Sequence, residues 1–262
     1  MPGIFFACVP LPRYYARLPN MTTRPMPAAP LYKEVREKLL ASITRGMWPP
    51  GNPLPSESLL AQEFGVSVGT LRKAVDELVL DKVLMRQQGR GTFVAPHNVD
   101  RTLHDFFRVR HEDGVSRFPQ VETLSLRRQR ADPQTCERLQ LAAGAHVVRV
   151  INRLSVHERP VVLDEILLPA TRFEGLTLQV MRQRPGTIYH LFQHRFGVNV
   201  LRGEEHVRAC RAGAREARHL NVQVGTPMLE VERLSLTYYD VPVEWRRSRV
   251  DTAHHYYMSE LG

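Results

Sequence analysis

The feature that most restricts how this chain can fold is a tight elbow, Gly65-Val66-Ser67, between two segments with helical apolar spacing. Gly65 stands where a helix needs a left-handed C-cap, and Ser67 stands where the next helix needs an N-cap. The residues after the elbow predict a helix over 68–80, with a packed stripe of Val68, Leu71, Val75 and Leu78. Such an elbow fits a DNA-reading helix pair or a plain αα-hairpin inside a bundle.

The segment before the elbow favours the first alternative. Apolar residues at four-residue spacing predict a first helix that starts at Leu31 and stops at Gly46. The proline-rich stretch 47–55 cannot be helical, and Ser56 is a natural N-cap for a short second helix over 57–64.

The segment after the third helix supports the same interpretation. Residues 82–96 predict two short strands around the turn Gly89-Arg90-Gly91. Three helices followed by a basic hairpin predict a winged helix-turn-helix over residues 30–97.

Size and composition set the outer limits. A chain of 262 residues predicts two modest domains, and no apolar run reaches the roughly 20 residues needed to cross a membrane. The formal charge of +9 favours a polyanionic partner only weakly, because the excess is spread along the chain. Three widely spaced cysteines predict no disulfide framework and fit a cytoplasmic protein. Residues 1–29 are interpreted as a disordered tail, or as residues that precede the true start at Met21.

The second half carries a weak internal repeat. Residues 98–118 are interpreted as a linker with one short helix, and residues 119–262 as an α/β region in which Arg-Leu-Ser recurs 80 positions apart, at Arg153 and Arg233. A duplicated helix–strand–strand unit predicts a mostly antiparallel sheet with helices on one face and a cleft between its halves. Strand alternation sends Arg149, Ile151, Arg153 and Ser155 to the face assigned to that cleft.

At this point a family resemblance is visible. Residues 31–94 resemble the DNA-binding domain of GntR-type transcriptional regulators, on the strength of Leu-Pro-Ser-Glu (54–57), Thr-Leu-Arg (70–72) and the wing Gly-Arg-Gly-Thr-Phe-Val (89–94). The second half is similar to the ligand-sensing UTRA domain of the HutC-type subfamily, through "RLSVHERPVVLDEILLP", "PGTIYHLF" and "PVEWRRSRVD". The resemblance implies an α+β protein in which the winged domain is linked to a chorismate-lyase-like antiparallel sheet with helices.

The resemblance implies a recognition helix that lies in the major groove. Thr70, Arg72 and Lys73 are the residues expected to contact the bases or phosphates there. Many relatives have arginine where this chain has Ser58 and Val68, so its operator is expected to differ. Arg90 could enter the minor groove or be a plain hairpin tip. The expected DNA-binding residues are Ser56, Glu57, Ser67, Gly69, Thr70, Arg72, Lys73, Gly89, Arg90 and Gly91.

Strand alternation and the resemblance together nominate a site for a small-molecule effector. A planar guanidinium such as Arg153 suits a carboxylate or phosphate, although relatives that bind phosphosugars often have a second basic residue where this chain has Ser155. A surface lattice of salt bridges is the alternative for these side chains. The expected ligand-binding residues are Arg149, Arg153, Ser155, Glu165, Thr187, Tyr189, Glu244, Arg249 and Asp251.

Other chemistry is not predicted. His190 with His194 and His254 with His255 lack further metal ligands in the nearby sequence, so we expect neither a metal nor a cofactor. No nucleophile elbow or phosphate-binding loop is present, so no enzyme is expected. The sequence predicts a cytoplasmic, homodimeric repressor that binds a pseudo-palindromic double-stranded operator under the control of a small-molecule effector. An enzyme with a vestigial DNA-binding domain and an architectural DNA binder are the alternatives.

Overall fold

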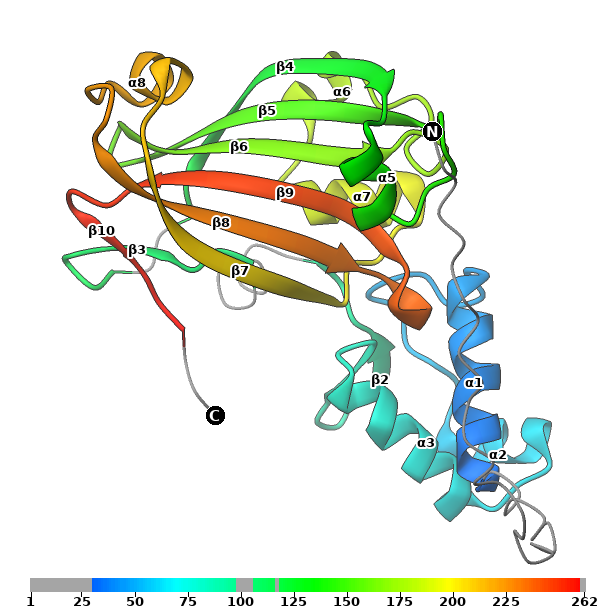
Figure 1. Ribbon diagram of the computed structural model, residues 1–262. Coiled ribbons are helices and arrows are strands. Elements are labelled where there is room, and N and C mark those ends of the chain that lie inside the picture. The colour runs from blue at the N-terminus through cyan, green and yellow to red at the C-terminus, as the bar shows by residue number, and fades with distance from the viewer. Residues whose placement is uncertain (1–29, 98–105, 116–117, 260–262) are drawn as a thin grey trace, which may run out of the picture. The chain divides into compact units, whose positions relative to one another are not determined.

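The computed structural model describes residues 30–97, 106–115 and 118–259 (Figure 1). The tail predicted over residues 1–29 lies outside these ranges, as do residues 98–105 and 116–117 of the proposed linker. No helix of the described residues is long and apolar enough to cross a membrane.

Three helices form the first part: α1 Leu31–Thr44, α2 Glu57–Phe64 and α3 Val68–Leu80. The predicted caps are confirmed, because Ser56 and Ser67 accept hydrogen bonds from the amides of Leu59 and Thr70, and Gly65 is left-handed with φ 64°. The stripe predicted for α3 was wrong at Val68, which is exposed because it occupies the first turn. The buried face of α3 is formed by Leu71, Ala74, Val75 and Leu78.

The predicted wing is confirmed. Strands β1 Leu84–Gln87 and β2 Gly91–Val94 pair antiparallel, and Pro53 bridges to Phe93 on the other side of β2. Gly89 and Gly91 have φ values of 72° and 110°, which residues other than glycine rarely adopt. The turn between the strands therefore depends on the two glycines that flank Arg90.

The second part is built on one antiparallel sheet of six strands, in the order β4-β5-β6-β9-β8-β7. A strand–helix–strand–strand unit occurs twice, and β6 pairs with β9 where the two units meet. This arrangement confirms the predicted duplication. The strands are β4 Gln120–Arg130, β5 His146–Val156, β6 Arg159–Pro169, β7 Arg202–Arg211, β8 Pro227–Leu236 and β9 Pro242–Asp251.

The prediction that helices cover one face of this sheet was wrong. Helices α6 Leu178–Gln183 and α7 Ile188–Phe196 lie behind the sheet in Figure 1, whereas α5 Pro133–Arg138 and α8 Ala214–Leu220 lie on its other side. Strand β6 is buried from Val161 to the end of the strand, as expected of a strand that is covered on both faces.

Two short elements complete the described chain. Strand β3 Val109–His111 pairs antiparallel with β10 His255–Tyr257, near the C-terminal end. Of the short helix predicted within the linker, the described residues contain Phe106, which is helical, whereas residues 109–111 are extended because they pair with β10. A 3-10 turn, η2 Tyr238–Asp240, joins β8 to β9.

Candidate functional site

A buried polar centre lies where α7 packs on strands β8 and β9. The Tyr189 hydroxyl donates to Glu244 Oε1 at 2.9 Å and lies 3.1 Å from Ser235 Oγ, which donates to the same carboxylate at 3.0 Å. Glu244 and Ser235 have no solvent exposure. Burial, followed by the charge of Glu244, raises the pKa of Tyr189, so this phenol stays protonated and remains a donor.

Arg246 holds this carboxylate on its other side. Its guanidinium donates to both oxygens of Glu244, at 3.1 and 3.0 Å, and to Asp164 Oδ2 at 3.1 Å. The second oxygen of Asp164 accepts from Ser248 Oγ at 2.6 Å. Burial raises the pKa of Asp164, while the adjacent Arg246 opposes that shift. The charge of Arg246 is therefore already matched within the protein.

A second arginine, Arg233, is matched in the same way. Arg233 Nε donates to Glu205 Oε1 at 2.6 Å, and the same guanidinium also donates to the backbone carbonyl of Phe106. Phe106 in turn packs edge-on against Tyr189, with ring centroids 4.8 Å apart. The residue that follows the undescribed segment 98–105 thus contacts the polar centre directly.

Beside this centre is a small pocket with a volume of about 50 Å³. Three arginines and one aspartate are among its lining residues, together with Phe106 and Thr187. Two polar atoms of the lining are buried without a hydrogen-bond partner among the described residues, Asn152 Oδ1 and Arg184 Nε. Buried polar groups are normally satisfied, so these two atoms mark where a ligand or water can bind.

Arg184 differs from the other two arginines of the pocket. Among the residues that the structure describes, no carboxylate forms an ion pair with it, and its hydrogen bonds go to Thr123 Oγ1 and to the carbonyl of Met181. Burial, followed by the charge of Arg246, lowers the pKa of Arg184. The pocket therefore holds one cation whose desolvation is not offset by an anion.

Three of the nine predicted ligand-binding residues lie at this site. Thr187 caps α7 at the pocket wall, Tyr189 also lines the pocket, and Glu244 lies beneath it. Asp251 lies elsewhere and accepts from the amide of Ala253. Ser155 is not among the residues that line the pocket.

The assignment of Arg149 and Arg153 to the cleft face was wrong. The pocket opens on the face that carries Asn152 and Leu154, so the neighbouring odd-numbered side chains point to the opposite side. There they form ion pairs, as the salt-bridge alternative expected. The pairs are Arg149–Glu165 at 2.5 Å, Arg153–Glu122 at 2.5 Å and Arg249–Glu230 at 2.6 Å.

The error has a simple structural cause. The left-handed glycines that precede β5 and β8, Gly144 and Gly225, are 81 positions apart, whereas the two Arg-Leu-Ser motifs are 80 positions apart. The structural counterpart of Arg233 is therefore Asn152, and a shift of one residue moves a side chain to the other face of a strand. Sequence inspection missed Asn152, Asp164, Arg184, Arg233 and Arg246 as site residues. The glycine spacing was the signal that could have placed Arg233.

The residues predicted to bind DNA lie on α2, α3 and the wing. Arg72 remains largely exposed, with its Nε 2.9 Å from Glu57, and Glu57 also contacts Arg86 of β1 at 3.2 Å. Because its carboxylate is already shared by two arginines, Glu57 is placed to orient them more than to meet phosphate. The cations Lys73 and Arg90 stack over the rings of Tyr32 and Phe93. The side chain of Thr70 is 2.8 Å from the Ser67 hydroxyl in the first turn of α3.

Comparison with known protein families decides the identity of both parts. Residues 31–94 match the family described as bacterial regulatory proteins, gntR family, and residues 116–255 match the UTRA domain. The chain belongs to the GntR family of regulators and carries a UTRA domain.

Alignments with two bacterial repressors cover most of this chain. The histidine utilization repressor of Pseudomonas putida is 30% identical over 230 residues, which cover 86% of this chain and 88% of that protein. The mannosyl-D-glycerate transport/metabolism system repressor MngR of Escherichia coli is 30% identical over 210 residues, 77% of this chain and 83% of MngR. These names are those of transcriptional repressors, not enzymes, and the chain is a ligand-modulated repressor of the same family.

A solved structure supports the fold of the second part. The ligand-binding domain of a protein described as a GntR-family regulator from Bordetella bronchiseptica is 36% identical, with a TM-score of 0.56. The match covers 59% of this chain and 96% of that domain. PhnF from Mycobacterium smegmatis, 23% identical with a TM-score of 0.51 over 87% of this chain and 99% of that one, shares the fold.

In this GntR-family protein, α7 connects the pocket to the end of the wing. The first turn of α7 lines the pocket, and Gln193, further along the helix, donates to the carbonyl of Ala95 at 3.0 Å and accepts from the amide of His97 at 2.9 Å. Gln193 also donates to Asn199 Oδ1 at 3.0 Å. One buried side chain thus satisfies the backbone of the residues that leave β2.

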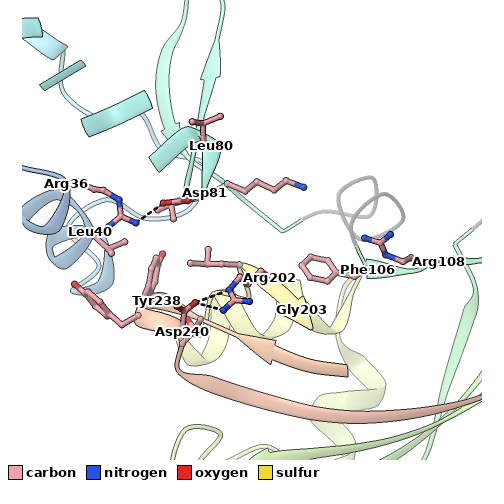
Figure 2. Close-up of a pocket in the computed structure, with 15 residues that line it drawn as sticks. Arg36, Leu40, Leu80, Asp81, Phe106, Arg108, Arg202, Gly203, Tyr238 and Asp240 are labelled. Atoms are coloured by element: carbon pink, nitrogen blue, oxygen red, sulfur yellow. Dashed lines mark hydrogen bonds and ion pairs between the residues drawn. The ribbon is translucent and has the colours of Figure 1, made fainter. Parts of the chain in front are cut away.

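A larger hollow, with a volume of about 690 Å³, is lined by residues of α1, the end of α3, β7 and η2 (Figure 2). Its labelled charged side chains include two internal pairs, Arg36 with Asp81 at 2.7 Å and Arg202 with Asp240 at 2.9 Å. Because these charges are already paired, this hollow is a poorer candidate for recognising an ion than the pocket at Arg184.

Proposed function

We propose that the effector of this repressor is a small carboxylic acid whose carboxylate binds Arg184. The observation that carries the proposal is an imbalance of charge in the pocket. Arg246 pairs with Glu244 and Asp164, and Arg233 pairs with Glu205. Arg184, by contrast, has no carboxylate partner among the described residues. A planar guanidinium binds a carboxylate through two parallel hydrogen bonds. The partnerless Nε of Arg184 supplies one of these donors.

The remainder of the pocket fits a polar substituent on such an acid. Asn152 Oδ1 is a buried acceptor with no partner in the part of the chain that the structure describes, so it suits a hydroxyl or amine of the ligand. The names of two relatives point to the same class, because histidine and mannosyl-D-glycerate both carry a carboxylate. Ser155 does not line the pocket, so the missing basic residue at that position does not count against a phosphosugar.

The ligand acts on DNA binding through Phe106 and α7 in this proposal. The pocket has room for only a few water-sized groups, so a metabolite requires Phe106 or Phe107 to move outward. Phe106 borders the segment that leads back to the winged domain, and α7 carries Gln193, which holds Ala95 and His97. An effector that favours one arrangement of these contacts changes operator affinity by its differential binding free energy.

The winged domain supplies the DNA contacts. We propose that α3 enters the major groove with Thr70, Arg72 and Lys73 near base edges or phosphates, and that Arg90 reaches from the wing. Two copies of the chain would then bind a pseudo-palindromic operator, because the two-fold symmetry of a dimer is mirrored by its half-sites. A protein with this role works where the chromosome is, which in a bacterium is the cytoplasm. We propose no catalytic activity for it.

Arg72→Ala is the test of the DNA-binding assignment. We expect the variant to bind an operator from the region upstream of its own gene about 5- to 150-fold more weakly, because one base or phosphate contact contributes roughly 1–3 kcal/mol. Electrophoretic mobility shift at moderate salt measures this. Arg218→Ala removes the same charge from α8 and should bind like the parent; equal affinity of both variants and the parent would rule out α3 as the recognition helix.

Gln193→Leu tests how the two parts communicate. We expect this variant to bind operator and carboxylate but to lose most of the roughly 5- to 150-fold change that the ligand causes in DNA affinity. Leucine fills a similar volume but cannot bond to the backbone of Ala95 and His97. Operator titrations with and without ligand measure the coupling, and Gln183→Leu on α6 is the control. Coupling that is undiminished in Gln193→Leu would exclude this route.

A further inference from the structure

We propose that His111, Asp113 and His157 form a binding site for a divalent transition-metal ion such as Zn²⁺. One ligand atom from each of these residues lies within 4.8 Å of the other two. His111 Nδ1 is 3.4 Å from Asp113 Oδ1, and His157 Nε2 is 3.8 Å from Asp113 Oδ2. Imidazole nitrogens and carboxylate oxygens bind Zn²⁺ at about 2.0–2.2 Å, so ligand atoms at this spacing can close on one ion through small side-chain rotations.

The three residues come from segments that are distant in sequence. His111 ends β3, Asp113 lies in the turn after it, and His157 begins the β5–β6 turn with a left-handed φ of 51°. The nearby-histidine patterns considered from the sequence could not reveal such a group, because only the tertiary fold brings the two turns together. The side chains of all three residues are partly exposed, so an ion from solution can reach them.

His255 gives independent support. It pairs with His111 in the β3–β10 register, and their ring centroids are 5.1 Å apart. The residue is 9% exposed, and its Nε2 is buried without a hydrogen-bond partner among the described residues. His255 therefore lies next to the site, outside the three ligand atoms that lie within 4.8 Å of one another, and it is tested below as a fourth ligand.

The competing explanation is a cluster of surface ion pairs. Asp113 also donates its amide to His111 Nδ1 at 3.2 Å, a bond that an ion on Nδ1 would replace. In that explanation His111 and His157 only form contacts with Asp113, and the cluster takes up no metal ion. The two explanations therefore differ in whether the chain takes up a metal ion, which can be measured directly.

An ion here would have a structural effect. It would tie the residues just after Phe107 to the β5–β6 turn and, through His255, to the C-terminal strand. Binding to the folded chain alone raises thermal stability by mass action. The site would thus anchor the start of the UTRA sheet beside the effector pocket without contributing a ligand to that pocket.

The experiment uses the full chain, stripped with a chelator and titrated near neutral pH with ZnCl₂ and with CoCl₂. We expect one tightly held ion per chain, a rise in Tm with Zn²⁺ and the visible absorption of four-coordinate Co²⁺. His157→Ala and Asp113→Asn should each weaken Zn²⁺ binding at least about tenfold, since each removes a ligand. Circular dichroism would verify that both variants are folded.

Two control variants make the result decisive. His206→Ala removes an exposed histidine on β7 and should leave the titration unchanged. His190→Ala tests whether the histidine pair on α7 is the true binder. The proposal fails if the parent takes up no ion, if His157→Ala and Asp113→Asn both bind like the parent, or if His190→Ala alone abolishes binding. Unchanged affinity in His255→Ala would remove His255 from the ligand set.

Discussion

A Glu244→Gln variant should be less stable than the parent by roughly 3–5 kcal/mol, the usual cost of removing one partner from a buried ion pair. Glu244 accepts hydrogen bonds from Tyr189, Ser235 and Arg246 and has no solvent exposure. The amide of glutamine keeps the shape but replaces one acceptor with a donor that faces other donors. For a domain of this size, the expected decrease in Tm is roughly 6–20 °C.

Glu204→Gln is the matched control for this prediction. Glu204 pairs with Arg202 at 2.8 Å, but both side chains are about half exposed, so the pair contributes between about 0 and 1 kcal/mol. Thermal unfolding followed by circular dichroism measures both variants. Equal Tm values for the two would mean that Glu244 is not a buried charge that the arginine stabilises.

Arg184→Met should abolish the response to the effector while leaving the protein folded. The loss of a buried charge partner costs about 2–5 kcal/mol in binding, so carboxylate affinity should fall roughly 30-fold to several thousand-fold. The ligand-free variant should be at least as stable as the parent, because it no longer buries a cation without a carboxylate partner among the described residues. Thermal shift against a panel of small carboxylates, histidine included, measures both effects.

The matched control is Arg182→Met. Arg182 lies on α6, two residues before Arg184, and donates to the carbonyl of Thr123, but it does not line the pocket. The Arg182→Met variant should show the same thermal shifts with the carboxylate panel as the parent. Operator binding should be normal in both variants. A carboxylate that stabilises Arg184→Met as strongly as the parent would refute the assignment of Arg184, whereas the DNA-binding assignment would stand.

Local signals were sufficient for the winged domain. The caps at Ser56 and Ser67, the glycine after α2 and the two glycines of the wing each act on their own few residues, so their effect can be predicted from neighbours in the sequence. Only Val68 was misplaced, because apolar spacing alone does not distinguish the first turn of a helix from its packed face.

The pocket proposed for the effector shows where that kind of prediction fails. Thr187, Tyr189 and Glu244 were predicted through the family resemblance of their helix and strand, and the structure places them at or beneath the pocket. Arg149 and Arg153 were placed on the wrong face because the duplicated Arg-Leu-Ser motif is one residue out of step with the structural repeat. Arg184, in the loop after α6, carries no pattern at all and becomes part of the site only when α7 packs on the sheet.

By itself, then, the sequence determined the helix pair, its wing, the duplicated strand unit and the family, because capping, turns and periodicity act over a few residues. Only the tertiary structure decided which face of β5 meets α7, which pocket arginine has no carboxylate partner among the described residues, and which histidines gather beside Asp113. Those properties depend on strand register and on charges that lie far apart in the chain, and a shift of one residue or one neighbouring carboxylate reverses them.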